Sequence, residues 1–263
     1  MIEFRKVSKA FDADVVLERV SFKISRGETK IILGASGSGK STILKLILGL
    51  IRPDEGHILM EGKDITVMRE RQLVEMRNDI GMVFQEGALF DSLSVLENVG
   101  YRLFENSDMS EEEIETTVQR LLGFVGLEEA IDKMPSELSG GMKRRVGIAR
   151  ALVGKPKVIL YDEPTAGLDP ITKRTIVELM IKLRDLEGVT SVFVTHDLQA
   201  AATIATEYAV AGDNVQVKFL RGGSDFCLAN IHFVVLQEGA ICFEGSYEEL
   251  MSSTIPYVRT FVT

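Results

Sequence analysis

The stretch TKIILGASGSGKSTILKLILGL, residues 29–50, decides the fold class of this chain. Its first residues, TKIIL, are typical of a short buried strand, and they run directly into the glycine-rich segment GASGSGKS. Helix-like apolar periodicity then extends from Ser41 to Leu50, and Pro53 followed by Asp54 ends it. This order of strand, glycine-rich loop and helix predicts an α/β protein.

The loop matches the pattern G-x-x-x-x-G-K-S through Gly34, Gly39, Lys40 and Ser41. Small residues let successive backbone N–H groups point at phosphate oxygens, and the following helix adds its positive N-terminal end. Lys40 would reach the β and γ phosphates, and the Ser41 hydroxyl can ligate Mg²⁺. A plain glycine turn is the alternative, but the full pattern should arise by chance in well under ~1% of chains this long. The residues expected to bind the nucleotide are Gly34, Ala35, Ser36, Gly37, Ser38, Gly39, Lys40, Ser41 and Thr42.

Polar residues follow three further strand-like stretches. In KVILYDE, residues 157–163, Asp162 would hold the hydration shell of Mg²⁺, and the Glu163 carboxylate is a candidate general base for an attacking water. Taken alone, this motif could also be a strand that ends in a solvated acidic turn. His196, after VFVT, could hydrogen-bond the γ phosphate, and Gln85, after MVF, could touch Mg²⁺ or the water. Each of these two residues could instead be structural or on the surface.

A second glycine-and-serine turn opens a helix in ELSGGMKRR, residues 137–145. Ser139 can cap that helix, and Gly140 and Gly141 allow close backbone approach. An ordinary capped helix with a basic solvated face is the alternative. One ATP molecule cannot easily use two phosphate cradles on one chain. The pattern therefore predicts two copies that face each other head to tail, each covering the nucleotide of the other.

The composition restricts the class of protein. Hydrophobic residues make up 45% and charged residues 26% of the 263, which is typical of a globular chain. The formal net charge of −9 argues against a general nucleic-acid binder. We find no secretory signal and no membrane-spanning run. Cys227 and Cys242 lack the spacing of a metal site or a disulfide framework, and a reducing cytoplasm fits.

The rest of the chain divides into an α/β body and a helical middle. Near the start, IEFRKV and VVLERVSFKI alternate as strands do. From about residue 69 to 154 the pattern is helical, and Ser110 with Glu113 forms a capping box. The apolar face after it is Ile114, Val118, Leu121, Leu122 and Val125. KVILYDE and VTSVFVTHD are typical of buried strands, with a helix over 171–186 between them, which is the parallel α/β pattern.

One segment, from about 208 to 231, fits this pattern badly. Val215, Val217 and Phe219 alternate with polar residues, and the following RGGS could turn the chain. These features predict an extra β-hairpin. It could bind a partner, or it could be a passive loop insertion.

Taken together, these motifs resemble those of the ATP-binding subunit of ABC transporters. GASGSGKS, Gln85, LSGGM at 138–142, VILYDE, AGLD at 166–169 and His196 occur in the order of that family, over nearly the whole chain. The resemblance implies a P-loop NTPase fold with a mostly parallel core sheet, an N-terminal antiparallel β subdomain and an inserted helical subdomain. The core would comprise 1–85 and 155–263, and the helical subdomain about 86–154.

The same resemblance assigns roles to residues. Glu163, His196 and Gln85 would be catalytic, and Ser41, Gln85 and Asp162 would hold Mg²⁺. Ser139, Gly140 and Gly141 would contact the γ phosphate of ATP on the opposite subunit, where Asp169 would link the two sites. Phe11 occupies the region where the family stacks an aromatic ring on adenine, although Phe4 and Phe22 flank it and either could simply belong to the core. The implied partners are a second copy of the ATPase and a permease that holds it at the cytoplasmic face of the inner membrane.

Three longer stretches are similar to the Mla/Mce-type lipid transport ATPases. They are MVFQEGALFDSLSVLENV (82–99), MPSELSGGMKRRVGIARAL (134–152) and YDEPTAGLDPIT (161–172). Met142 stands where most ABC proteins have glutamine, and GALF follows Gln85. This resemblance implies phospholipid transport with a permease and an Mce-domain substrate-binding protein. Leu89, Phe90 and Leu93 would contact the permease, or else pack inside. Two alternatives stay open, namely import of a small solute and regulation of a membrane complex.

Overall fold

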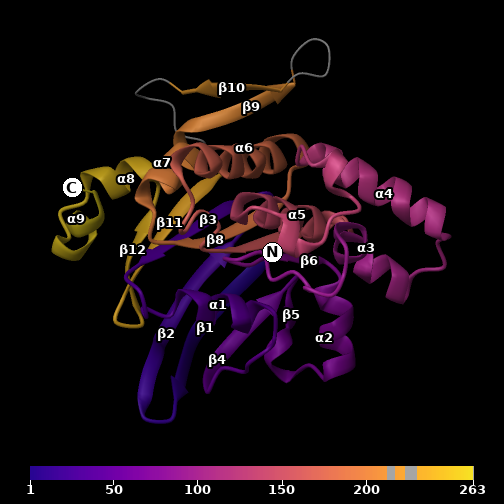
Figure 1. The fold of residues 1–263 in the computed structure, drawn as a ribbon. Coiled ribbons are helices and arrows are strands. Elements are labelled where there is room, and N and C mark those ends of the chain that lie inside the picture. The colour runs from indigo at the N-terminus through magenta and orange to yellow at the C-terminus, as the bar shows by residue number, and fades with distance from the viewer. Residues whose placement is uncertain (212–216, 223–229, 263) are drawn as a thin grey trace.

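The computed structural model of the chain describes residues 1–211, 217–222 and 230–262. A six-stranded sheet lies at its centre, in the order β12-β11-β3-β8-β7-β6 (Figure 1). Five of the strands are parallel, and β12 pairs antiparallel with β11 at one edge. Their bounds are β3 Thr29–Gly34, β6 Ile80–Val83, β7 Val158–Asp162, β8 Thr190–Thr195, β11 Ile231–Gln237 and β12 Ala240–Gly245.

A second sheet, entirely antiparallel, packs below the central one in Figure 1. Its order is β2-β1-β4-β5, and its bounds are β1 Ile2–Phe11, β2 Asp14–Ile24, β4 Glu55–Met60 and β5 Lys63–Asp64. Short 3₁₀ turns cover Ile65–Val67, Glu128–Ala130 and Pro135–Glu137. The α-helices are α1 Lys40–Ile47, α2 Glu70–Arg77, α3 Val95–Asn106, α4 Glu111–Phe124, α5 Gly140–Leu152, α6 Pro170–Glu187, α7 Leu198–Thr206, α8 Tyr247–Ser252 and α9 Pro256–Val262. In the part of the chain described here, no helix combines the length and the apolar character needed to cross a membrane.

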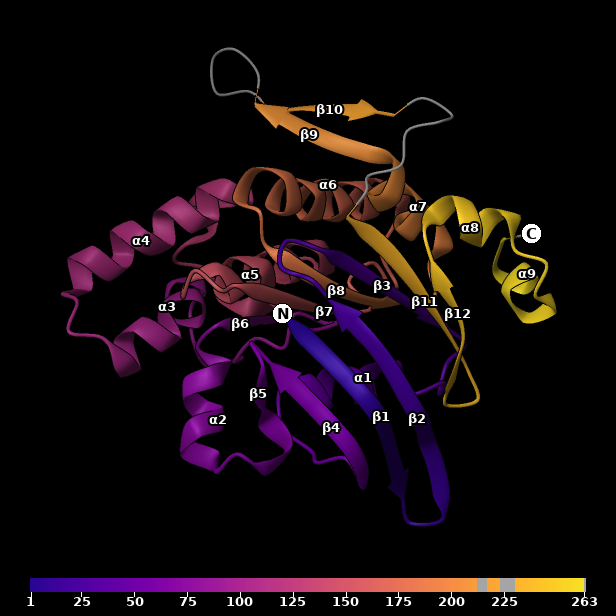
Figure 2. The same ribbon diagram turned by 180° about the vertical axis from the view of Figure 1, so that it is seen from behind.

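The central sheet separates two hydrophobic cores, because neighbouring residues of a strand point to opposite faces. In β3, Ile31 and Leu33 belong to one core and Ile32 belongs to the other. Helices α5, α6 and α7 cover the first face, while α1 and the antiparallel sheet cover the second (Figure 2). Burial on both faces explains why these strands are apolar at nearly every position.

Two local predictions can be compared directly with the structure. The capping box is confirmed, since the Ser110 side chain accepts from the Glu113 N–H and the Glu113 carboxylate accepts from the Ser110 N–H at 2.7 Å. The predicted end of the first helix at Leu50 is wrong, because α1 ends at Ile47. Gly49 adopts the left-handed conformation with φ of 62°, and the Leu50 N–H bonds to the Lys45 carbonyl. This glycine-based end terminates the helix before Pro53 is reached.

The segment that fits the sequence pattern badly forms a separate two-stranded sheet. Strand β9, Glu207–Ala211, pairs antiparallel with β10, Val217–Arg221, and the two strands lie above α6 in Figure 1. The Ala209 N–H donates to the Asp185 carboxylate of α6 at 2.8 Å, which ties β9 to that helix. Val215 and the last residues of RGGS lie outside the described residues. RGGS does not join β9 to β10, because it follows the start of β10 and its Arg221 is the last residue of that strand.

Candidate nucleotide-binding site

The predicted polar residues meet at one edge of the central sheet. Strands β3, β6, β7 and β8 are parallel, so their carboxyl ends lie at the same edge. The segments that follow these strands carry the glycine-rich loop, Gln85, Glu163 and His196, and Asp162 is the last residue of β7. The topology therefore brings together residues as far apart in the sequence as Ala35 and His196.

The glycine-rich loop joins β3 to α1, and its shape requires glycine at defined positions. Gly39 is the N-cap of α1 and has φ of 97°. A Cβ atom there would lie 2.7 Å from the Leu17 side chain and 2.8 Å from the Val16 carbonyl oxygen. At Gly34, a Cβ atom would lie 2.4 Å from the Ser38 Oγ. The tight turn ahead of α1 therefore depends on the absence of a side chain at these two positions.

Lys40 and Ser41 connect the loop to the acidic end of β7. The Lys40 Nζ donates to the carbonyls of Gly34 at 2.8 Å and Ala35 at 2.9 Å, and it lies 3.7 Å from Glu163 Oε1. Burial lowers the pKa of Lys40, although the neighbouring carboxylates act in the opposite direction. The Ser41 hydroxyl donates to Asp162 Oδ1 at 2.9 Å. Burial also raises the pKa of Asp162, against that hydrogen bond.

The Ser41 hydroxyl and the Asp162 carboxylate fit a Mg²⁺ ion bound together with phosphate. Mg²⁺ prefers hard oxygen ligands and in nucleotide sites takes one or two from protein, with the rest from phosphate and water. These two oxygen groups are adjacent, and both lie beside the glycine-rich loop. Gln85 lines the same cleft with a further oxygen. The donor set is therefore of the right chemistry.

Glu163 is held in an unusual backbone conformation with φ of 47°. Its Oε2 accepts from the Thr195 hydroxyl at 3.2 Å and from the His196 N–H at 3.3 Å, and lies 3.0 Å from His196 Nδ1. Its other carboxylate oxygen, Oε1, faces the Lys40 Nζ at 3.7 Å. One carboxylate oxygen is thus fixed by the end of β8, while the other faces the loop lysine.

The cleft formed by these elements has a volume of about 840 Å³. Most of the predicted site residues line it, namely Phe11, Ala35, Ser36, Gly37, Gly39, Lys40, Ser41, Thr42, Gln85, Asp162, Glu163 and His196. The structure also distinguishes Phe11 from the two phenylalanines that flank it in the sequence. Phe11 is 44% exposed at the cleft, whereas Phe4 and Phe22 stack on each other in the core, with ring centroids 4.6 Å apart.

Gly34 and Ser38 do not line the cleft, because both are buried and lie against each other within the loop. The second glycine turn is also elsewhere on the same chain. Ser139 caps α5, its side chain accepting from the Met142 N–H, and both Ser139 and Gly140 are exposed. A Cβ atom at Gly141 would lie 2.3 Å from the Thr172 side chain. This contact places the turn beside the exposed start of α6, where Asp169 is the N-cap.

Two residues that line the cleft escape the sequence patterns. Val16 comes from β2, and Phe261 comes from α9 at the opposite end of the chain. Tyr257, also in α9, accepts a hydrogen bond from the Ala35 N–H at 3.4 Å. No motif surrounds Phe261 or Tyr257, and only the folding of α9 back towards the loop brings them there.

The chain matches a known family over much of its length. The sequence model of the family described as ABC transporter matches residues 17–166. Protein TRIGALACTOSYLDIACYLGLYCEROL 3, chloroplastic, from Arabidopsis thaliana is 41% identical, over 100% of this chain and 73% of its own length. Intermembrane phospholipid transport system ATP-binding protein MlaF from Escherichia coli K12 is 36% identical, over 100% of this chain and 88% of its own. Probable ribonucleotide transport ATP-binding protein mkl from Mycobacterium leprae is 36% identical, over 99% of this chain and 68% of its own length.

A solved structure has the same fold. It is the dimeric post-hydrolysis state of the ATP-binding cassette MJ0796 bound to ADP and Pi, with a TM-score of 0.78 and 32% identity. The match covers 94% of this chain and 98% of the other. The cleft and the order of motifs agree with these relationships. The chain therefore belongs to the ABC transporter family and is one of its ATPase subunits.

Proposed function

We propose that this ATPase drives the transport of phospholipid between membranes, as the motor subunit of an Mla/Mce-type system. The observation that carries the proposal is the full-length similarity to MlaF, whose name describes an intermembrane phospholipid transport system. The three stretches quoted above, at 82–99, 134–152 and 161–172, support the same branch of the family.

The positions of the residues in the cleft support a distinct role for each of them. Lys40 and the loop N–H groups would bind the phosphates, and Ser41, Asp162 and Gln85 would hold Mg²⁺, which neutralises phosphate charge when bound. Glu163 would accept a proton from the attacking water through the oxygen that faces Lys40, because its other oxygen is already bonded to β8. His196 would hydrogen-bond the γ phosphate. Phe11 offers an exposed ring for the base.

A homodimer is the second part of the proposal. Ser139, Gly140 and Asp169 are exposed, and they lie on a surface that is separate from the cleft of their own chain. An exposed capped helix start with a bare glycine is suited to bind the phosphate of a second copy. The dimeric arrangement of the related cassette bound to ADP and Pi supports this geometry.

The contact with a permease would use the loop after Gln85. Asn98 is fully buried, and its amide group donates to the carbonyls of Phe90, Leu93 and Ser94 and accepts from the Phe90 N–H. These hydrogen bonds tie Phe90, Leu93 and Ser94 to α3. Phe90 is 47% exposed, whereas Leu89 and Leu93 are half-buried. Phe90 is therefore the strongest of the three candidates for contact with the permease.

This contact would hold the ATPase at the cytoplasmic face of the inner membrane. The assembly would also include an Mce-domain substrate-binding protein and no nucleic acid. Within the ATPase, residues 1–85 and 155–263 would form the catalytic core, and about 86–154 the helical subdomain. The pair β9–β10 would be an insertion in that core.

The cargo separates this proposal from its main alternative. The relative mkl is named for ribonucleotide transport, which favours a small-solute transporter as the second candidate function. The third candidate function is regulation of a membrane complex without transport, in which ATP turnover would not depend on cargo.

The experiment that tests the proposal is a pull-down of the tagged chain from detergent-solubilised membranes, with mass spectrometry of the proteins and lipids. The matched control is the Phe90→Ser variant, in which the proposed contact is weakened while the nucleotide cleft is unchanged. Recovery of a permease, an Mce-domain protein and phospholipid, all depleted in the control, would support the lipid assignment. A permease with a solute-binding protein and no enriched lipid would refute it and favour the small-solute alternative.

A further inference from the structure

The end of strand β8 makes more contacts with Glu163 than the family motifs account for. The Thr195 side chain is almost fully buried, with 4% of the residue exposed, directly behind Glu163. Its hydroxyl lies 3.2 Å from Glu163 Oε2. The same hydroxyl lies 3.0 Å from the backbone nitrogen of Asp197. A buried hydroxyl with two partners is strongly restricted in its orientation.

The direction of these two hydrogen bonds follows from the donors available. The Asp197 N–H can only donate, so the Thr195 oxygen must accept from it. The one hydroxyl hydrogen then remains for the Glu163 carboxylate, which can only accept when ionised. Threonine is β-branched, and this further restricts the rotation of its side chain. The hydroxyl is therefore oriented to donate to Glu163.

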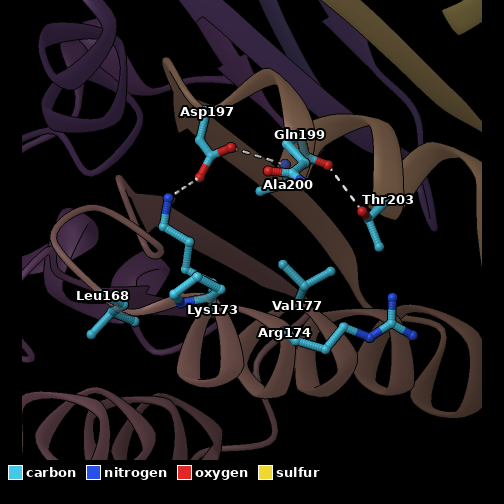
Figure 3. A pocket seen from close by; sticks show the side chains of 9 residues that line it. Leu168, Lys173, Arg174, Val177, Asp197, Gln199, Ala200 and Thr203 are labelled. Carbon is cyan, nitrogen blue, oxygen red and sulfur yellow. Dashed lines mark hydrogen bonds and ion pairs between the residues drawn. The ribbon is translucent and has the colours of Figure 1, made fainter.

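Asp197 is itself held from the far side by helix α6. Its Oδ2 accepts from Lys173 Nζ at 2.8 Å and from the Thr165 hydroxyl at 3.2 Å, and its Oδ1 accepts from the Ala200 N–H at 3.0 Å. Figure 3 shows Lys173 reaching across a pocket of about 200 Å³ to Asp197. The Asp197 side chain thus has every oxygen engaged, and its backbone cannot shift without breaking these bonds.

Lys173 belongs to the first turn of α6, together with Asp169. The Lys173 N–H donates to the Asp169 carbonyl at 2.9 Å, so both residues move with the same helical turn. Continuous contacts therefore run from the exposed start of α6 through Lys173, Asp197 and Thr195 to one oxygen of Glu163.

We propose that Thr195 is a positioning residue for Glu163 in ATP hydrolysis, and that Lys173 and Asp197 hold Thr195 in place. The proposal rests on the proposed role of Glu163 as general base. Bonding of Oε2 by Thr195 and His196 leaves Oε1 on the cleft side, where it faces Lys40. Without the hydroxyl, Oε2 keeps only its contacts with His196, and the carboxylate is less firmly oriented.

The test uses Thr195→Val, which keeps the shape of the side chain and removes the hydroxyl, and Thr195→Ser, which restores it. A hydrogen bond to a charged group contributes enough for kcat to fall about 10- to 100-fold in the valine variant. KM and the dissociation constant for ATP should stay near the wild-type values. The melting temperature should fall in the valine variant and recover in the serine variant, because valine also leaves the part-buried Asp197 N–H without its acceptor. Serine should return kcat to within about 3-fold, because the donor is present again.

Two further variants locate the effect. Lys173→Met should lower kcat by about 3- to 10-fold, since it removes one partner of Asp197 and leaves the Thr195 hydroxyl in place. Thr203→Val is the matched control. Thr203 lines the same pocket, but its hydroxyl donates to the Gln199 carbonyl within α7 and not to Asp197 (Figure 3). The kcat of the Thr203→Val variant should therefore equal that of the wild type.

A double-variant cycle separates this inference from the proposed role of Glu163. If Thr195 acts through Glu163, adding Thr195→Val to Glu163→Gln should not lower the residual single-turnover rate any further. An equal fall in both backgrounds, a wild-type kcat in Thr195→Val, or a loss that serine does not restore would each overturn the inference. If Glu163→Gln alone keeps wild-type turnover, the proposed base itself is wrong, whatever Thr195 does.

Discussion

Replacement of Glu163 by glutamine tests the proposed base with little change in shape. The glutamine oxygen can take the place of Oε2 and accept from the Thr195 hydroxyl and the His196 N–H. The amide nitrogen then takes the place of Oε1, which lies 3.7 Å from Lys40 Nζ. The hydrogen bonds to β8 survive, and the variant should fold. What it loses is the ability to accept a proton and the charge that faces Lys40.

The size of the catalytic effect follows from general-base catalysis, and that of the charge effect from the Lys40–Glu163 distance. General-base catalysis contributes about 10²- to 10⁴-fold, so the variant should raise the barrier by about 3–5 kcal/mol. The attraction between Lys40 and Glu163 at 3.7 Å is about 4–5 kcal/mol at an effective dielectric constant of 20, before desolvation offsets much of it. With that carboxylate neutralised, Lys40 has less competition for an anionic ligand. The affinity for ATP should therefore be retained or increased, and an ATP-bound dimer should accumulate.

Phosphate release measures the turnover, equilibrium binding of ATP measures the affinity, and light scattering with size-exclusion chromatography measures the dimer. Glu187→Gln is the control, because that carboxylate is at the far end of α6 and outside the cleft. Turnover of Glu163→Gln within about 3-fold of wild type would refute the role of the base, since its expected contribution is at least about 10²-fold. A variant that neither turns over nor binds ATP would show that the glutamine does not preserve the site.

Three further outcomes are expected. Lys40→Ala should weaken ATP binding about 10- to 100-fold and abolish turnover, because a charged donor is lost; titration calorimetry checks this, and the exposed Lys45→Ala on the same helix should bind normally. Gly39→Ala should cost about 1–3 kcal/mol from the backbone conformation alone, with added overlap against Val16, and a lower melting temperature with lost ATP binding checks it. Burial acts to raise the pKa of Asp197, but hydrogen bonds from Lys173 and the Ala200 N–H outweigh it and hold the pKa below its usual value. This group therefore stabilises the fold above its unfolded pKa of about 3.9, and the contribution is lost as the pH falls through the lower folded pKa. Urea midpoints should place Asp197→Asn below wild type at pH 7, and the difference should shrink towards pH 2.

The sequence by itself identified the parts of the site that depend on local backbone geometry. The loop before α1 needs glycine at Gly39 because of its positive φ and the nearby Val16 carbonyl, and such a requirement appears as a motif. The capping box at Ser110 and the alternation of buried strands are local in the same sense. The end of α1 was missed because a Gly49 in the left-handed conformation overrides the apolar period that continues to Leu50.

Only the tertiary structure decided which distant side chains meet. Phe261 reaches the cleft because α9 folds back towards the loop, and Lys173 reaches Asp197 because α6 packs beside the start of α7. The sequence likewise places the second glycine turn and the loop in one chain, whereas the fold puts Ser139 on a surface away from the cleft. Motifs record what a backbone needs from its own neighbours in sequence. Contacts between side chains more than twenty positions apart depend on how helices and strands pack, and no local pattern specifies that packing.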